Sequence, residues 1–201
     1  MEYKRIRTHS ADDHYKKFLG GGASQWQSRG LFQLDFMKLV GLGTNNSLLD
    51  IGCGPGRGGI HLIRYLNEEK YFGFDFNIDF IKIFQETVLK EKLSKKRASI
   101  RCVDDFLPGL PKSKTFDYAV AFSVLNHANR AQKAQFFANI PGLMSQNGRV
   151  FVTHGGWFAD KSSRFQTKFR LLREIGPELI DPKKYGWRQH ETIYPILEFG
   201  L

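Results

Sequence analysis

The sequence predicts an α/β fold, a doubly wound and mostly parallel sheet of about six to seven strands with helices on both faces. Three observations predict it. Short apolar runs alternate with helical patterns from Ser47 to His154, as in β-α-β units. The runs are almost continuously apolar, which is typical of strands covered on both faces. The first run ends at an aspartate and is followed by a glycine-rich loop, "DIGCGPGRGG".

The region before the first expected strand is predicted to be helical. Residues 28–43 carry apolar side chains at helical spacing, and Gly41 and Gly43 end the pattern. The expected apolar face consists of Leu31, Leu34, Phe36, Met37, Leu39 and Val40. We expect residues 1–43 to form an N-terminal helical lid or accessory segment, followed by a domain at residues 44–201.

The elements of that domain follow in order. Asn77 is placed to cap a helix that begins at Ile78. Pro195 predicts an edge or bulge position for the last strand, because proline cannot donate a ladder hydrogen bond. Strands are expected at 47–52, 70–75, 98–103, 116–125, 148–154 and 191–199, and helices at 58–69, 78–93, 130–144 and 162–175.

Composition limits the class of protein. The chain has 201 residues, of which 41% are hydrophobic, enough for one domain with its own core. It has neither an apolar run near the roughly 18 residues of a membrane span nor the apolar core of a signal peptide at its start. The two cysteines, Cys53 and Cys102, are both expected in buried positions, which favours a reduced, cytoplasmic protein without disulfides. The formal charge of +10 permits a polyanionic partner, although a solvated basic surface is the simpler interpretation.

The glycine loop raises the question of its ligand, which in such sheets lies beyond the carboxyl ends of the strands. A phosphate-binding P-loop needs a Gly-Lys-Ser/Thr ending, which this loop lacks. A dinucleotide fingerprint fits Gly54, Gly56 and Gly59, with Asp75 available for a ribose. Asp50 argues against that ligand, because a carboxylate before the loop would repel a pyrophosphate. It favours a ligand that carries positive charge, such as the sulfonium and amino groups of S-adenosylmethionine.

These residues resemble a known family. "LLDIGCGPGRGG" resembles motif I of the class I S-adenosylmethionine-dependent methyltransferases, which have a Rossmann-like fold. "YFGFDFN", "CVDDF", "FDYAVAFSVLNHA" and "LMSQNGRVFVTH" are similar to the family's segments at the second, third, fourth and fifth strands. The resemblance covers about Ser47 to His154. It implies a cofactor-binding half at residues 44–154 and an acceptor-side part at residues 155–201.

The resemblance also implies which residues bind S-adenosylmethionine and its product S-adenosylhomocysteine. Asp75 would hold the ribose hydroxyls, and Asp105, with Asp104 as the alternative, would accept from the adenine amino group. Phe106 would lie by the adenine ring. The implied cofactor-binding residues are Asp50, Gly52, Cys53, Gly54, Gly56, Asp75, Phe76, Asp104, Asp105, Phe106, Phe122 and Ser123.

The sequence says less about the methyl acceptor than about the cofactor. The segment Ala121–Val124 lacks the Asn/Asp-Pro-Pro-aromatic motif of adenine and glutamine methyltransferases. Metal-dependent catechol-type enzymes place carboxylates after the fourth and fifth strands; Phe122–Val124 and His154–Gly156 have none, so no metal is expected. "SVLNHA" resembles an element of many small-molecule and sugar methyltransferases. It makes His127 the first candidate for a catalytic base, because an imidazole can accept a hydroxyl proton near neutral pH. His154 is the second candidate. A structural role is the alternative for both, as core packing is for Trp157, Phe158 and Trp187.

Three functional hypotheses follow. The first is a metal-independent methyltransferase that acts on a hydroxyl, less readily an amine, of a small molecule or glycan. The second is an RNA methyltransferase that contacts phosphates through Lys161, Arg164, Lys168, Arg170 and Arg173. The third is a cofactor-binding subunit without activity of its own. The sequence indicates no particular oligomeric state.

Overall fold

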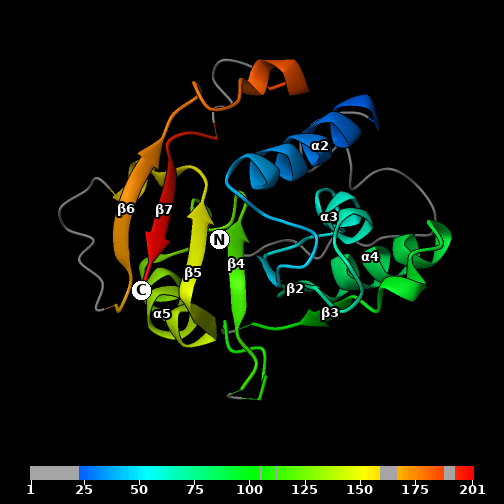
Figure 1. The fold of residues 1–201 in the computed structure, drawn as a ribbon, viewed down its shortest axis with the longest axis horizontal. Helices are drawn as coiled ribbons and strands as arrows, with labels where there is room; N and C mark the ends of the chain where they lie inside the picture. Colours follow the sequence, from blue (N-terminus) through cyan, green and yellow to red (C-terminus); the bar gives the residue numbers. More distant parts are fainter. Residues whose placement is uncertain (1–22, 105, 112, 159–166, 188–192) are drawn as a thin grey trace.

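A seven-stranded sheet with the order β3-β2-β1-β4-β5-β7-β6 forms the centre of the protein (Figure 1). The computed structural model describes residues 23–104, 106–111, 113–158, 167–187 and 193–201. The first five strands are parallel, and β7 runs antiparallel to both of its neighbours. The strands are β1 (Leu48–Ile51), β2 (Tyr71–Asp75), β3 (Ser99–Cys102), β4 (Phe116–Ala121), β5 (Met144–Val152), β6 (Arg170–Ile175) and β7 (Ile196–Gly200).

Helices cover both faces of the sheet, which confirms the predicted fold class. Successive residues of β1 point to opposite sides: Leu48 packs in the cluster beneath α2, α3 and α4, and Leu49 packs in the cluster beneath α5. The arrowheads of β4 and β5 point toward α2 in Figure 1, so α2 lies near the carboxyl ends of the parallel strands. The helices are α2 (Ala23–Leu39), α3 (Gly59–Tyr65), α4 (Ile78–Lys90) and α5 (Arg130–Asn139), with short 3₁₀ turns η1 (Ser94–Lys96), η2 (Ile140–Leu143), η3 (Gly155–Phe158) and η4 (Pro182–Tyr185).

The buried face of α2 differs from the predicted one. Phe32, Phe36 and Met37 are fully buried, whereas Leu31 and Leu39 are 38% and 55% exposed. The helix contacts α3 on one side and η4 on the other, which turns Phe32 toward the protein and the two leucines toward solvent. The prediction of a helix was correct, but its apolar face was wrong at these two leucines and omitted Phe32.

Local signals placed α4 and the parallel strands well. The side chain of Asn77 accepts hydrogen bonds from the backbone amides of Asp79 and Phe80, as expected of a helix cap. Strand β4 ends at Ala121, before the predicted Leu125, because Ser123 has a φ of +58° that no extended strand accommodates. Strand β5 begins at Met144, before the predicted Gly148.

The carboxyl-terminal predictions were partly wrong. Residues 170–175 form the strand β6 and not the end of a helix; positions 162–166 lie outside the described residues. Pairing with β7 overrides the local helical pattern there. Strand β7 begins directly after Pro195 and lies between β5 and β6, so it is not an edge strand. The proline precedes the ladder and therefore removes no hydrogen bond from it.

The surface follows from this layout. Cys53 is buried as expected, but Cys102 is exposed because it ends the edge strand β3. Among the described residues, no helix has the length and apolar character needed to cross a membrane.

Candidate active site

The glycine loop joins β1 to α3 at the carboxyl edge of the sheet. Gly52, Gly54 and Gly56 all have positive φ, at +67°, +55° and +87°. Within the described part of the chain, a Cβ on Gly54 would meet no atom within 4 Å, so a ligand can lie directly against the backbone there. A Cβ on Gly56 would lie 2.3 Å from the ring of Phe84, which shows that this glycine lets α4 pack closely on the loop. The loop therefore combines one glycine that faces open space with one required by packing.

Asp75 ends β2 and fastens the glycine loop. Its Oδ2 accepts a hydrogen bond from the amide of Gly54 at 3.0 Å, and its Oδ1 accepts one from the amide of Asn77 at 2.9 Å. Burial raises the pKa of this carboxyl group, and the hydrogen bonds from Asn77 and Gly54 oppose that rise. Asp75 thus holds the loop in shape from a place next to the open face of Gly54.

Asp50 lies buried beneath the loop and is held by a tyrosine. The hydroxyl of Tyr71 donates to Oδ2 of Asp50 at 2.6 Å. Burial raises the pKa of Asp50 to about 7; the hydrogen bond from Tyr71 lowers this pKa and the charge of Asp75 raises it further. Gly73 pairs with Asp50 in the sheet, and a Cβ there would lie 2.9 Å from the Tyr71 hydroxyl. The missing side chain of Gly73 thus lets the Tyr71 ring reach across.

The residues that follow β2 and β3 divide into exposed and packed ones. Phe76 is 57% exposed beside Asp75, and Asp104 is also exposed. Asp105, the first choice for the adenine contact, lies outside the described residues. The ring of Phe106 packs edge-on against Phe74 and Phe136, at 6.3 and 5.7 Å, and so belongs to the core on the α5 face. Burial raises the pKa of the Cys53 thiol, which suits a packing residue better than a nucleophile.

A serine and a histidine meet where β4 and β5 end. The Oγ of Ser123 lies 3.0 Å from Nε2 of His154, and the amide of Ser123 donates to Oγ1 of Thr153 at 2.7 Å. Both Ser123 and His154 have left-handed backbone angles, with φ of +58° and +57°. Non-glycine residues rarely adopt such angles, and those that do cluster at functional sites. The backbone therefore bends at two neighbouring strand ends to bring these side chains together.

The other residues predicted near β4 have other contacts. His127 is exposed, and its Nε2 lies 3.2 Å from Nδ2 of Asn126. The ring of Phe122 packs edge-on against Phe32 and Phe36 of α2. Phe122 thus joins the end of β4 to the helix above it.

The three aromatic residues that the sequence left open are also separated. Trp157 and Phe158 pack around Phe137, and Phe158 also contacts Phe199, so both belong to the core under α5. Trp187 follows η4 and lies against α2, within reach of the glycine loop through Arg57.

Sequence reasoning missed several groups at this edge. Tyr71 and Thr153 each orient a predicted residue, yet neither was assigned a role. The signal that could have identified Tyr71 is a residue with a polar group at the start of an apolar strand, two positions before a glycine. Arg57 stood inside the recognised loop motif, and Arg29 lay in the predicted helix, but the sequence does not show that the two approach each other.

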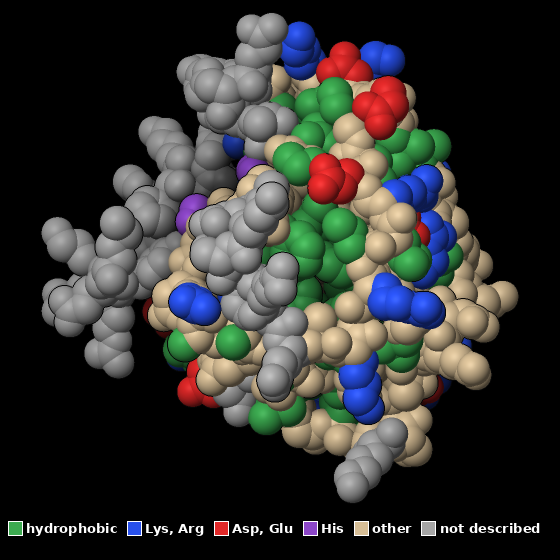
Figure 2. Space-filling view, turned by 90° about the vertical axis from the view of Figure 1, so that its left-hand side faces the viewer, with side chains coloured by type: hydrophobic (Ala, Val, Ile, Leu, Met, Phe, Trp, Pro, Cys, Tyr) green, Lys and Arg blue, Asp and Glu red, His purple; other side chains and the backbone are tan. Residues whose placement is uncertain are grey.

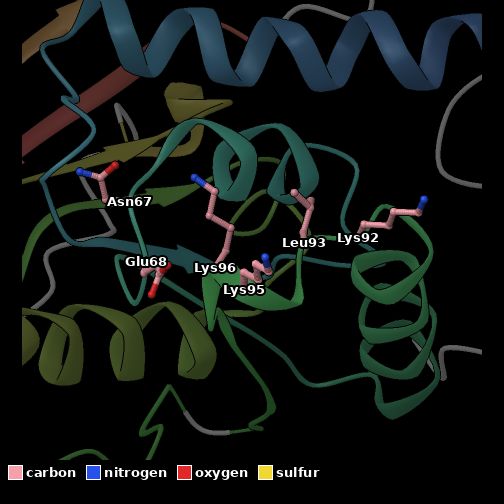
Figure 3. A pocket seen from close by; sticks show the side chains of 6 residues that line it. All are labelled: Asn67, Glu68, Lys92, Leu93, Lys95 and Lys96. Atoms are coloured by element: carbon pink, nitrogen blue, oxygen red, sulfur yellow. The ribbon is translucent and has the colours of Figure 1, made fainter.

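A hollow of about 510 Å³ lies at the amino ends of the strands β2 and β3, at the other end of the sheet from the glycine loop (Figure 3). Asn67 and Glu68 line it just before β2, and Lys92, Lys95 and Lys96 line it before β3. Lys96 donates to the carbonyl of Leu66 at 2.5 Å, so this cation connects the segment before β3 to the segment before β2. The hollow is therefore separate from the site at the carboxyl edge.

Comparison with known proteins places the glycine loop in a family. Residues 49–150 match the sequence model of a family described as a methyltransferase domain. That match spans β1 to most of β5, which includes Asp50, the glycine loop, Asp75 and Ser123.

Solved structures share the whole fold. Magnesium protoporphyrin IX methyltransferase from Synechocystis PCC 6803, with S-adenosylhomocysteine bound, is 14% identical with a TM-score of 0.63; the match covers 93% of this chain and 92% of that one. The same enzyme with bound S-adenosylmethionine gives a TM-score of 0.57 at 16% identity, over 98% and 88% of the two chains. The [4+2]-cyclase SpnF matches at 18% identity and a TM-score of 0.61, over 85% and 79%. At these identities the likeness concerns the fold alone, and one of these proteins is a cyclase.

Proposed function

Because the chain belongs to the family of S-adenosylmethionine-dependent class I methyltransferases, we propose that it methylates a hydroxyl group of a small molecule or sugar without a metal ion. The observation that carries the choice of a hydroxyl is the pair of Ser123 and His154, since a hydroxyl acceptor benefits from a base that takes its proton. An amine acceptor would need only to be neutral, and it is the less favoured alternative.

The loop geometry fits the methyl donor. Gly54 faces open space, while Asp75 fixes the loop beside it and Phe76 is exposed next to Asp75. We assign the methionyl part to the glycine loop and the ribose to Asp75. We assign the adenine to Phe76, which follows β2, and to Asp104 and Asp105, which follow β3. The buried carboxylate of Asp50 supplies negative charge beneath the loop. When bound, S-adenosylmethionine supplies a methyl group on a sulfonium, which passes to the acceptor oxygen as the carbon–sulfur bond breaks.

His154 is proposed as the base and Ser123 as the residue that orients it. The imidazole takes the proton of the acceptor hydroxyl while the oxygen forms its bond to the methyl carbon. The contact of Ser123 Oγ with Nε2 of His154 fixes the orientation of the imidazole at the ends of β4 and β5. Thr153 in turn accepts a hydrogen bond from the backbone amide of Ser123. His127 remains the alternative base; it is exposed, whereas His154 is held by Ser123 at the ends of β4 and β5.

The test combines acceptor identification with two histidine variants. Methyl-labelled S-adenosylmethionine is incubated with the chain and with separate metabolite, glycan and RNA fractions. Label should enter a metabolite or glycan, with or without a chelator. With that acceptor, His154→Gln should lower kcat about 10²- to 10⁴-fold, the usual contribution of a general base, and leave S-adenosylhomocysteine affinity unchanged. An unaltered kcat in His154→Gln, together with a loss in His127→Gln, would contradict the assignment of His154.

The two other hypotheses correspond to other outcomes. Label in RNA would favour the basic surface as a docking site. Of the five cations named for that role, Lys161 and Arg164 lie outside the described residues, and Arg173 already pairs with Glu198. On the face shown in Figure 2, lysine and arginine side chains are interspersed with acidic and hydrophobic ones. Tight cofactor binding without label in any fraction would favour a non-catalytic subunit.

A further inference from the structure

The hollow at the amino ends of β2 and β3 has walls that are bonded to each other (Figure 3). The backbone amide of Glu69, just before β2, donates to the carbonyl of Lys96, in η1, at 2.8 Å. The guanidinium group of Arg97 contacts the carboxylates of Glu68 and Glu69, at 2.9 and 3.3 Å. These bonds hold the two segments together, so the hollow is a preformed feature of the fold.

The carboxylates in these segments are matched by arginines. Arg97 pairs with Glu68 and Glu69, and Arg64 of α3 pairs with Glu91, just after α4, at 3.0 Å. The carboxylates therefore do not need the lysines of the hollow as partners. The two arginines, in turn, do not extend the positive charge into a stripe that a nucleic-acid backbone could follow.

Lysines supply the remaining charge of the hollow. Lys92, Lys95 and Lys96 all line it (Figure 3). Among the described residues, the side chains of Lys92 and Lys95 have no partner for a hydrogen bond or an ion pair. Lys96 uses one of its three ammonium hydrogens for the carbonyl of Leu66, and two remain. Three ammonium groups therefore line one hollow with most of their donors unused.

Tight turns around the hollow carry charged side chains where glycine fits best. Glu69, Lys92 and Arg97 have positive φ, at +61°, +56° and +48°. Glycine adopts such angles without strain and is the usual residue just after a helix, where Lys92 stands. The helix dipole accounts for Lys90 in the last turn of α4, but its effect does not reach the cations beyond that turn. Charge therefore stands at positions where the local geometry favours glycine.

The lining indicates the class of ligand. Among the described residues that line the hollow none is aromatic, so the lining offers no ring on which a nucleobase can stack. Leu93, the apolar residue of the lining, is only 8% exposed. An ammonium group binds phosphate as a point charge, and three of them exceed the charge of a single phosphate. The volume of about 510 Å³ lies within the range of small-molecule sites.

We propose that the hollow binds a small anion that carries at least two phosphate groups. Lys92 and Lys95 supply the unpaired charges, and Lys96 adds a donor from the wall that it holds in place. The site is separate from the glycine loop, so the inference does not rest on the proposed function.

Titration calorimetry with pyrophosphate at low salt tests the site. The test variant carries Lys92→Met and Lys95→Met. The control variant carries Lys82→Met and Lys168→Met, which remove the same charge from two exposed lysines outside the hollow. Thermal unfolding without ligand shows whether each variant is folded.

Pyrophosphate should bind the wild type more tightly than inorganic phosphate does, and added salt should weaken the binding. The test variant should lose at least about tenfold in affinity, as expected for two charged hydrogen bonds, and the control variant should keep the wild-type affinity. A wild type that does not bind pyrophosphate, a preference for phosphate, or equal losses in the two variants would overturn the proposal.

Two further titrations distinguish this site from the alternatives. Saturation with S-adenosylhomocysteine should leave the pyrophosphate affinity unchanged, whereas competition between the two ligands would overturn the separate site. A short single-stranded RNA should bind no more tightly than pyrophosphate. Tighter RNA binding that the test variant loses would assign the lysines to an RNA surface instead. A wild type that binds pyrophosphate but not S-adenosylhomocysteine would contradict the proposed function and support the anion site alone.

Discussion

The hydroxyl of Tyr71 donates a 2.6 Å hydrogen bond to Oδ2 of Asp50, under the loop to which we assign the methyl donor. This bond lowers the pKa of Asp50, although burial still keeps that pKa at about 7. The ionisation of Asp50 therefore falls within the range in which the protein is expected to work. Because the donor is cationic, its affinity should depend on this ionisation.

Replacing Tyr71 by phenylalanine should change the pH dependence of donor binding. Without the hydrogen bond the pKa of Asp50 rises, so a higher pH is needed to charge the carboxylate. Titration calorimetry with S-adenosylmethionine across pH should show the midpoint move upward. Tyr65→Phe is the control, since Tyr65 donates to a backbone carbonyl, that of Leu42, and not to a carboxylate. An identical midpoint in Tyr71→Phe and wild type would contradict the role of the pair.

Asp50→Asn should weaken binding of the methyl donor and increase the free energy of unfolding at neutral pH relative to the wild type. The pKa of Asp50 is raised on folding, so its contribution to stability is complete below the unfolded pKa of 3.8 and is lost as pH rises through about 7. The free energy of unfolding of the wild type should fall relative to the variant by a few kcal/mol over this range, since each pKa unit corresponds to about 1.4 kcal/mol. Urea unfolding at several pH values measures the difference. Parallel pH curves for the two proteins would show that Asp50 is not desolvated.

Ser123→Ala tests the orientation of His154. Loss of the Ser123 hydroxyl should lower kcat by about tenfold or more, because an imidazole that turns freely is seldom placed to accept the proton. The dissociation constant of S-adenosylhomocysteine is measured alongside, because the resemblance also places Ser123 among the cofactor-binding residues. Ser47→Ala serves as the control, because Ser47 bonds to Asp117 at the other end of the strands. If both serine variants lower kcat equally, Ser123 has only a structural role.

Glu198 should control the stability of the antiparallel edge. It is buried in β7 between Arg149 of β5 and Arg173 of β6, at 2.6 and 2.5 Å. Burial alone would raise the pKa of Glu198, but the hydrogen bonds from the two arginines outweigh it and lower that pKa. Its stabilisation should therefore be present above the unfolded pKa of about 4.3 and disappear as pH falls through the lower folded value.

Glu198→Gln should accordingly lower the free energy of unfolding by about 3 kcal/mol at neutral pH, as for a broken buried pair, and by less in acid. Glu91→Gln, which breaks the exposed pair with Arg64, should have an effect below about 1 kcal/mol. Thermal or urea unfolding at two pH values distinguishes the two. A loss in Glu198→Gln that does not depend on pH would contradict the ion-pair account.

The sequence predicted the parts of this fold that local signals determine. The sequence placed β1, β2 and the Asn77 cap correctly. Their apolar runs and turn residues are adjacent in the chain, so local signals are enough to identify them. β6 was mistaken for a helix, because its strand form depends on pairing with β7, more than twenty residues later in the chain. Leu171 and Leu172 lie exposed on it, so their spacing carried no signal of burial.

The site was predictable residue by residue but not as an arrangement. Asp50 and Ser123 were selected from motifs, whereas their partners depend on strand order and register. Tyr71 reaches Asp50 only because Gly73 stands opposite that aspartate, and His154 meets Ser123 only because β5 lies next to β4. The approach of Arg29 to Arg57 likewise depends on how closely α2 settles on the loop.

Binding of S-adenosylhomocysteine to a matched pair of glycine variants tests the central claim most directly. Gly54 and Gly109 both have positive φ, +55° and +61°, and a Cβ on either would meet no atom of the described residues within 4 Å. Alanine at each position should therefore strain the backbone alike, by about 1–2 kcal/mol. We predict that calorimetry will find wild-type affinity in Gly109→Ala and at least about tenfold weaker binding in Gly54→Ala, whose methyl group occupies the ligand's space, a difference of about 1.4 kcal/mol. Equal affinities in the two variants would contradict the placement of the methyl donor on the glycine loop.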